Sequence, residues 1–95
     1  MPAIKTIADF RAAVRHGRFA WPGGYPLFFI TADGAAISFD GAKKDRRNIL
    51  EAIRDNDARS GWRVCAVDVN WEDSDLRCDV TGERIESAYA EDSQS

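Results

Sequence analysis

The residues best suited to metal chemistry lie in one turn near the C-terminal end of the sequence. Cys78 is followed three positions later by Thr81 and then by Gly82, the spacing of a Cys-x-x-Cys-Gly zinc knuckle without its second cysteine. A knuckle of this kind presents two thiolates from one tight turn to one metal ion. Ser38 and Gly41 have the same spacing forty residues upstream, without a cysteine. We therefore expect the shape of a metal module that binds no metal.

Cys65 and His16 are the other side chains that could contribute to a metal site. A structural zinc site uses four ligands, and neither residue has a partner at knuckle spacing, so we predict neither a metal nor another cofactor. Cys65 lies in an apolar run and is expected to be a small core side chain with a free thiol, a disulfide with Cys78 being the alternative. His16 is expected in the last turn of a helix, where the helix dipole favours a cation.

Catalysis would need a set of groups that the sequence does not place together. There is no second histidine and no serine or cysteine nucleophile in a recognisable setting, so a catalytic triad cannot be built from local signals. Paired carboxylates could act as acid and base, which would require Asp68 and Asp79 to converge in a pocket. We predict that the protein is not an enzyme.

Five carboxylates cluster in sequence: Asp68, Glu72, Asp73, Asp75 and Asp79. Carboxylates can bind Mg²⁺ or Ca²⁺, but this spacing does not match an EF-hand loop. An acidic turn in water is one interpretation. The functional interpretation is that Glu72, Asp73, Asp75 and Asp79 contact a basic surface of a partner.

Aromatic side chains flank a turn-rich loop. Trp21 and Tyr25 stand on either side of Gly23 and Gly24, and aromatic side chains beside a rigid turn can anchor an interface. They could equally fill the end of a small sheet. The two glycines alone do not make a phosphate-binding loop, because the lysine and the spacing of that motif are missing.

Charge is distributed unevenly along the chain. Residues 1–67 carry 11 Lys/Arg and 7 Asp/Glu, whereas residues 68–95 carry 2 Lys/Arg and 9 Asp/Glu, so net charges of +4 and −7 make up the total of −3. The two parts could attract each other or face water, or one face could bind a charged partner. The cations expected on the second helix could contact phosphates; they are Lys43, Lys44, Arg46, Arg47 and Arg54.

The elements that must position these groups follow from capping residues and hydrophobic spacing. A helix is predicted over residues 6–16, beginning at the cap Thr6 with Asp9 in its first turn. A short apolar strand at 27–31 and a second strand at 35–38 flank Asp33-Gly34, a hairpin signal. Ser38 is expected to cap one long helix over residues 39–57.

The second half of the chain is expected to complete a sheet. Residues 62–71 form the clearest strand, with Cys65, Val67, Val69 and Trp71 alternating onto one face. A short fourth strand is predicted at 76–80. A last helical turn is expected at 85–89, from Ile85, Ala88 and Tyr89.

The order α-β-β-α-β-β predicts an α+β fold, with a small antiparallel sheet of three to four strands and two helices on one face. We expect one domain over residues 1–90 and a disordered acidic tail at 91–95. Since no apolar run is long enough to span a bilayer and no signal region opens the sequence, we expect a soluble, cytoplasmic protein without membrane contact.

Three segments resemble a group of small uncharacterised bacterial proteins that phages, prophages and plasmids often carry. The segments, at 22–34, 69–73 and 78–89, read PGGYPLFFITADG, VNWED and CDVTGERIESAY, and the resemblance covers most of residues 19–91. Some members of the group carry cysteines at the knuckle positions, and this chain is similar to those that do not. The resemblance implies a mobile-element context and brings no established activity or catalytic residue.

Together these features favour a binding module without catalytic activity that occupies a surface of another protein. For a protein of mobile-element origin, the partner would be a host defence or regulatory factor, with the anti-CRISPR and anti-restriction classes as examples. The alternative is a nucleic-acid-binding module derived from a zinc ribbon that has lost its metal. It would contact phosphates through Lys43, Lys44, Arg47 and Arg54.

Overall fold

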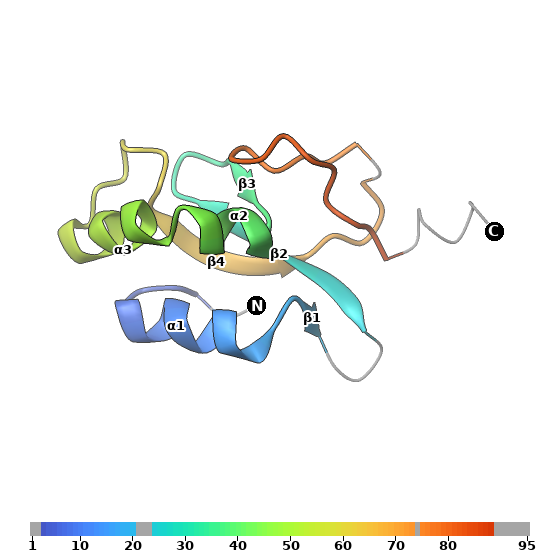
Figure 1. The fold of residues 1–95 in the computed structure, drawn as a ribbon, viewed down its shortest axis with the longest axis horizontal. Coiled ribbons are helices and arrows are strands. Elements are labelled where there is room, and N and C mark those ends of the chain that lie inside the picture. Colours follow the sequence, from blue (N-terminus) through green and yellow to red (C-terminus); the bar gives the residue numbers. More distant parts are fainter. Residues whose placement is uncertain (1–2, 21–23, 74, 89–95) are drawn as a thin grey trace.

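The computed structural model describes residues 3–20, 24–73 and 75–88 (Figure 1). Three helices and four strands follow one another along the chain. In order they are α1 (Ile7–His16), β1 (Phe19–Ala20), β2 (Tyr25–Thr31), β3 (Ala36–Ile37), α2 (Phe39–Lys44), α3 (Arg46–Asp55) and β4 (Val64–Val69). The fold is α+β, as the sequence predicted. The element order agrees approximately with the expected one.

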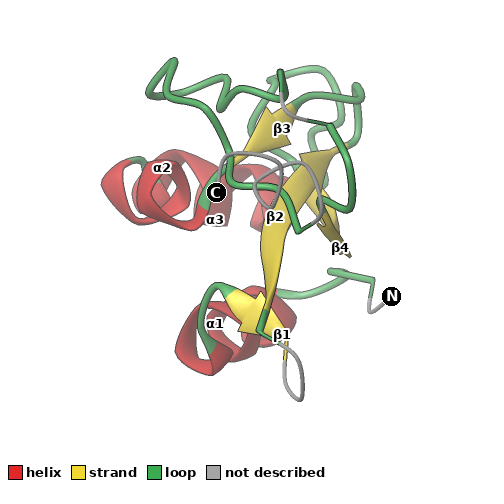
Figure 2. Cartoon of the chain, turned by 90° about the vertical axis from the view of Figure 1, so that its right-hand side faces the viewer, coloured by secondary structure: helices red, strands yellow, loops and turns green. Residues whose placement is uncertain are grey.

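All four strands are antiparallel to their neighbours, and β2 pairs with each of the others. It pairs with β1 at its start, with β3 near its end, and with β4 from Leu27 to Thr31. Ala3 adds a single bridge to Ala66 on β4. The helices lie together on one face of this sheet (Figure 2).

Three aromatic side chains form the centre of the core between the helices and the sheet. Phe29 of β2 stacks on Phe39 of α2 with ring centroids 4.4 Å apart, and Phe10 of α1 packs on Phe29 at 5.3 Å. All three are buried. The apolar face of α1 and the buried face of β2 therefore pack against each other at one aromatic cluster.

The first helix forms where the sequence predicts it. The Thr6 side chain accepts a hydrogen bond from the Asp9 N–H, and the Asp9 carboxylate accepts one from the Thr6 N–H, which makes a capping box. His16 lies in the last turn, with Nδ1 3.3 Å from the carbonyl oxygen of Gly17.

The long helix expected over residues 39–57 is wrong, because the chain forms two helices separated at Asp45. The Asp45 backbone leaves the helical region with φ −111° and ψ 31°. Aspartate has low helix propensity, and the break lets α2 bury Phe39 while α3 buries Ile49 and Ile53. Helix α3 ends at Asp55, and its C-cap Asn56 has a left-handed backbone conformation.

The alternation predicted for residues 62–71 is corrected by a bulge in β4. Ile30 pairs with Ala66 but Thr31 pairs with Val64, so Cys65 is an extra residue. Val64 is therefore fully buried, whereas Cys65 is half-buried. Trp71, also expected on the buried face, lies beyond the end of β4 at Val69 and is 44% exposed.

After Val69, the described residues form neither a helix nor a strand. The strand predicted at 76–80 is wrong: Arg77 makes one isolated bridge to Arg84, which closes a tight turn. The helical turn expected from residue 85 is also missing from the described part, while Tyr89 and the tail at 91–95 lie outside it. We refer to residues 70–73 and 75–88 as the C-terminal segment.

Candidate functional site

The four knuckle positions of the sequence lie together around the Cys78 thiol. Cys78 Sγ accepts a hydrogen bond from the Ser38 backbone N–H at 3.2 Å. A Cβ atom on Gly41 would lie 2.6 Å from that sulfur, so only glycine fits there without a shift of its neighbours. Hydrogen bonds from Thr81 also reach the sulfur. We call Ser38, Gly41, Cys78 and Thr81 the Cys78 cluster.

The environment of Cys78 lowers the pKa of its thiol. Burial alone raises the pKa of Cys78, but hydrogen bonds from Ser38 and Thr81 outweigh it and bring the pKa below its ordinary value. The side chain is nonetheless only 2% exposed. The cluster therefore holds a polarised thiol in the interior, with little access for a reagent or substrate.

Within the described residues, no three His, Cys, Asp or Glu side chains lie close enough together to hold a metal ion. Three of the four positions in the Cys78 cluster lack a thiol or imidazole, and hydrogen bonds reach the sulfur from two of them. Cys65 and Cys78 are both free thiols. The Cys78 cluster joins β3 and the start of α2 to the C-terminal segment. The Ser38 N–H donates to Cys78 Sγ, and the neighbouring Asp79 N–H donates to the Ala36 carbonyl oxygen.

Asn70 is a second attachment point of the C-terminal segment. This residue is 3% exposed. Its side-chain Nδ2 donates to the carbonyl oxygens of Asp73, Ile85 and Glu86, at 3.0–3.2 Å. Its Oδ1 accepts from the Asp73 N–H. One buried amide thus ties the turn at Asp73 to the chain at Ile85 and Glu86.

An aromatic pair stands directly beside this amide. The rings of Tyr25 and Trp71 pack at 4.8 Å between centroids with planes inclined by 54°. Glu72 and Asp73 follow Trp71 in sequence and are exposed, as is Asp75, whose N–H donates to the Asp73 carboxylate at 2.9 Å. We call this surface the aromatic–acidic face; it comprises Tyr25, Trp71, Glu72, Asp73 and Asp75.

The structure brings some of the predicted partner-binding residues together and separates one. Tyr25 and the acidic turn meet through Trp71, which sequence reasoning missed as a surface residue because its strand alternation placed it in the core. Asp79 is attached near Ala36, whose partner Ile30 lies five residues along β2 from Tyr25, or about 17 Å at strand spacing. Asp79 is therefore not part of this face. Trp21 lies outside the described residues.

The predicted phosphate contacts lie on α2 and α3, in the part of the chain that carries net positive charge. Lys43, Lys44, Arg47 and Arg54 line one hollow of about 400 Å³ beside α1. An adjoining hollow adds two cations of α1, Arg11 and Arg15. Their spacing of four residues on one helix was the signal that could have identified them.

The charged halves of the chain are not paired with each other in the described residues. The salt bridges there are Arg18–Asp40, Arg47–Glu51 and Arg54–Asp55, all within the first part of the chain. No salt bridge joins a cation of the described residues 3–67 to a carboxylate of the C-terminal segment, although Arg18 lines one hollow with Glu83 and Glu86. Of the alternatives left by the charge pattern, mutual attraction therefore has no salt bridge to support it.

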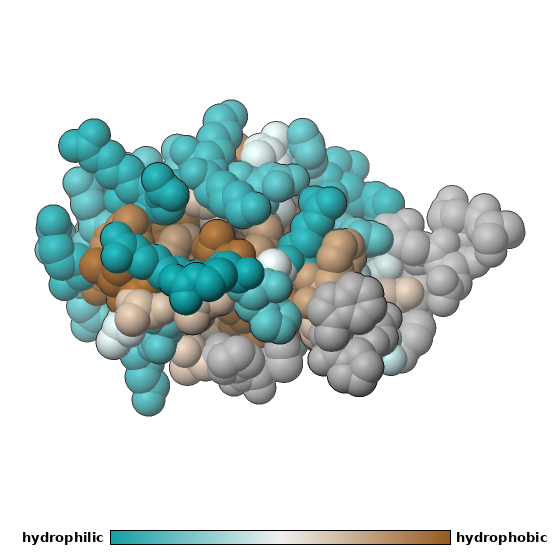
Figure 3. Space-filling model, turned by 60° about the horizontal axis from the view of Figure 1, so that its bottom comes forward, coloured by the Kyte–Doolittle hydropathy of each residue, from teal (hydrophilic) through white to brown (hydrophobic). Residues whose placement is uncertain are grey.

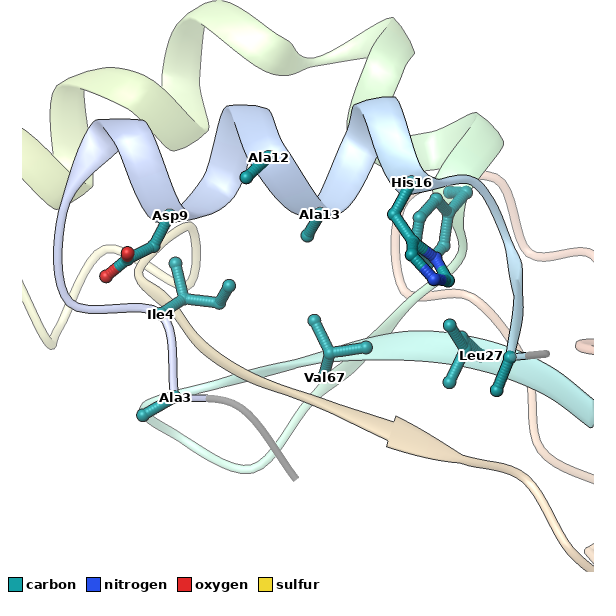
Figure 4. Close-up of a pocket in the computed structure, with 10 residues that line it drawn as sticks. Ala3, Ile4, Asp9, Ala12, Ala13, His16, Leu27 and Val67 are labelled. Carbon is teal, nitrogen blue, oxygen red and sulfur yellow. The ribbon is translucent and has the colours of Figure 1, made fainter. Parts of the chain in front are cut away.

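An apolar cavity of about 400 Å³ lies between α1 and the sheet (Figure 4). Ile4, Leu27 and Val67 form its walls, and Asp9 and His16 stand near its two ends. The Asp9 carboxylate already accepts hydrogen bonds from the Lys5 and Thr6 N–H groups, which lower its pKa. This cavity offers space for an apolar group but no coupled acid and base.

The two carboxylates proposed as a catalytic pair do not share this cavity. Asp68 is half-buried on β4, and its Oδ1 accepts from the Val69 N–H at 2.7 Å. Asp79 is exposed in the turn held near Ala36. Neither lines the cavity between α1 and the sheet.

Comparison of the chain with protein-family models, with curated proteins and with solved structures found no match. In the part of the chain that the structure describes, no helix has both the length and the apolar composition to cross a membrane. The site must therefore be interpreted from its own geometry.

Proposed function

We propose that this protein is a binding module without catalytic activity that acts by occupying a surface of another protein. The aromatic–acidic face is the part that would make this contact. The resemblance to proteins of mobile elements makes a host defence or regulatory factor the class of partner to test first. The cysteine-poor Cys78 cluster is consistent with descent from a zinc ribbon.

The observation that carries the proposal is the exposure of Trp71 beside Tyr25 and the buried Asn70. Among the described residues Trp71 is the large hydrophobic side chain that stands out to solvent, at 44% exposure. It packs on Tyr25 and directly follows the buried Asn70, so contacts within the chain position its side chain. Interfaces gain most of their affinity from a few such aromatic residues, and a preformed geometry lowers the entropy cost of binding.

The charge around the aromatic pair indicates what the partner surface would carry. Glu72, Asp73 and Asp75 are exposed, and none of them is in a salt bridge with a described residue. Carboxylates at the rim of an interface speed the approach of a basic surface and disfavour an acidic one. A partner with lysine or arginine around a pocket for an indole ring fits this face.

Nucleic-acid binding is the second candidate, and the cations along α2 and α3 support it. Lys43, Lys44, Arg47 and Arg54 line one hollow, as phosphate contacts would require. Such binding weakens steeply as salt rises, because phosphate contacts release counterions. Retention on DNA or RNA at low salt with a steep salt dependence would favour this candidate over the first.

The test is capture from a bacterial lysate with the tagged protein, with and without nuclease, followed by mass spectrometry. We expect a stoichiometric protein partner that survives nuclease treatment. Two charge reversals make a matched pair: Glu72→Lys lies on the aromatic–acidic face and Glu83→Lys lies in the turn near Cys78. Loss of the partner with Glu72→Lys alone supports the face; a partner retained by both, or lost on nuclease treatment, contradicts it.

A further inference from the structure

A groove with an apolar floor and basic walls runs between α1 and α3. Its floor contains Ile7 and Val14 of α1 and Leu50 of α3, all half-buried. Two hollows of about 400 and 460 Å³ share Arg46 and Leu50 in their linings, so they adjoin each other. The space-filling view shows the apolar surface over the helices crossed and flanked by hydrophilic side chains (Figure 3). We call this the basic groove.

The walls of the basic groove carry an excess of positive charge. Seven cations line it, against the single carboxylate of Glu51: Arg11, Arg15, Lys43, Lys44, Arg46, Arg47 and Arg54. Glu51 offsets little of this charge, since its pair with Arg47 spans 3.9 Å and the Arg47 side chain is 93% exposed. Arg54 is paired with Asp55 at 3.0 Å, which leaves the excess on the other cations. Within the described residues, Arg15 and Arg46 form no salt bridge at all.

The dimensions of the basic groove match those of a helix. Both α1 and α3 have 10 residues, which gives each a length of about 15 Å. A helix from another protein, lying along α1 and α3, would place apolar residues at i, i+3, i+4 and i+7 on the floor and acidic residues against the walls. Both features of the groove, apolar floor and basic walls, are then used.

Nucleic acid would use only the walls. Phosphates could pair with the cations, but a phosphate backbone leaves the aliphatic floor without an apolar partner. Stacking of bases requires exposed aromatic faces, and the aromatic side chain in this groove, Phe10, is fully buried. We propose that the basic groove binds an acidic amphipathic helix of a partner protein. This is a second binding surface, distinct from the aromatic–acidic face.

The experiment selects ligands from a displayed library of helical peptides about 14 residues long, roughly 21 Å as a helix. The bait is the full chain, compared with Arg15→Glu/Arg46→Glu and with Arg59→Glu. Arg59 is exposed in the loop after α3 and does not line the basic groove. Circular dichroism establishes that each variant is folded before selection.

We expect enrichment of acidic peptides whose apolar residues recur at helical spacing. For an enriched peptide measured by fluorescence anisotropy, the double reversal in the groove should weaken binding by about tenfold or more, and Arg59→Glu by much less. A scrambled peptide of the same composition should bind at least about tenfold more weakly, because only the phased sequence covers the floor.

Three results would overturn the proposal. One is enrichment of peptides without helical phase; the second is equal loss of binding in the groove variant and the Arg59→Glu control. The third is displacement of the peptide by duplex DNA at equal charge concentration, which would assign the groove to nucleic acid. None of these results bears on Glu72 or Trp71, so failure here is distinguishable from failure of the aromatic–acidic face.

Discussion

In the helical layer, formed by α1, α2 and α3, stability comes from apolar packing on the sheet: Phe10 of α1 and Phe39 of α2 contact the ring of Phe29 on β2, and all three are fully or almost fully buried. In the C-terminal segment, stability comes from two polar anchors, the Asn70 amide and the Cys78 thiol. They hold in place a segment that has no helix or strand in its described part. The helical layer carries the basic groove, and the C-terminal segment carries the acidic residues and Trp71. The two surfaces therefore rest on two different kinds of support.

This difference predicts that the two regions respond differently to mutation. A change at the aromatic core should unfold the whole domain, because both the helices and the sheet pack on it. A change at a polar anchor should first release the C-terminal segment, since protein regions with few apolar contacts open at lower free energy than the core.

The largest effect is expected for Phe29→Ala. Phe29 lies between Phe10 and Phe39, so its removal leaves a cavity at the centre of the core. The loss should be about 3–5 kcal/mol of unfolding free energy, measured by urea denaturation with circular dichroism. If the helices keep their full stability without this ring, the core does not join them to the sheet as described.

Asn70→Ala should be next, at about 2–3 kcal/mol, because it leaves buried backbone groups without partners. Hydrogen exchange should lose protection at the Ile85 and Ala88 N–H groups, which bond to Leu76 and Asn70, while α1 and α3 keep theirs. Asn48→Ala, an exposed asparagine on α3, is the matched control. Uniform loss of protection along the chain would show that the segment and the helical layer are one cooperative unit.

Gly41→Ala should cost about 1–3 kcal/mol through overpacking, since the new Cβ would lie 2.6 Å from Cys78 Sγ. Removing the sulfur should relieve the clash. The double variant Gly41→Ala/Cys78→Ala should thus be less destabilised than the sum of the two single variants. Additive losses in thermal unfolding would mean that Gly41 is required for another reason.

The smallest effect concerns the start of α1. Thr6→Ala should lose about 1 kcal/mol as a helix cap. Asp9 has a pKa lowered first by hydrogen bonds from the Lys5 and Thr6 N–H groups, so its contribution is present above the unfolded-state pKa of about 3.9. That contribution disappears as pH falls through the lowered folded-state pKa. The Tm difference between wild type and Asp9→Asn should therefore shrink below about pH 4; a difference independent of pH would contradict the capping box.

The sequence predicted what depends on local pattern. The capping residues of α1, the apolar strand β2 and the α+β class follow from spacing and caps. The bulge at Cys65 could not be foreseen, because alternation alone assigns every second residue of a strand to one face. Alternation also extended the strand to Trp71, whereas β4 ends at Val69. The break at Asp45 depends on where α2 and α3 must pack, which one helical pattern does not specify.

In the candidate sites too, features that depend on local spacing could be predicted, and features that depend on tertiary packing could not. The spacing of Ser38, Gly41, Cys78 and Thr81 indicated a shared turn geometry, and these positions do meet. The basic groove needed tertiary structure, because Arg11 and Arg15 come from a helix distant in sequence from Arg46. No local pattern connects the two helices before the fold places them side by side.

The central claim, that the protein binds another protein through the aromatic–acidic face, is tested most directly by one affinity comparison. The partner identified by nuclease-resistant capture is titrated against wild type and Trp71→Ala, both shown to be folded. Because an exposed interface tryptophan is typically worth 2 kcal/mol or more, we predict that Kd rises by about thirtyfold. An unchanged Kd would place the contact elsewhere and contradict the claim.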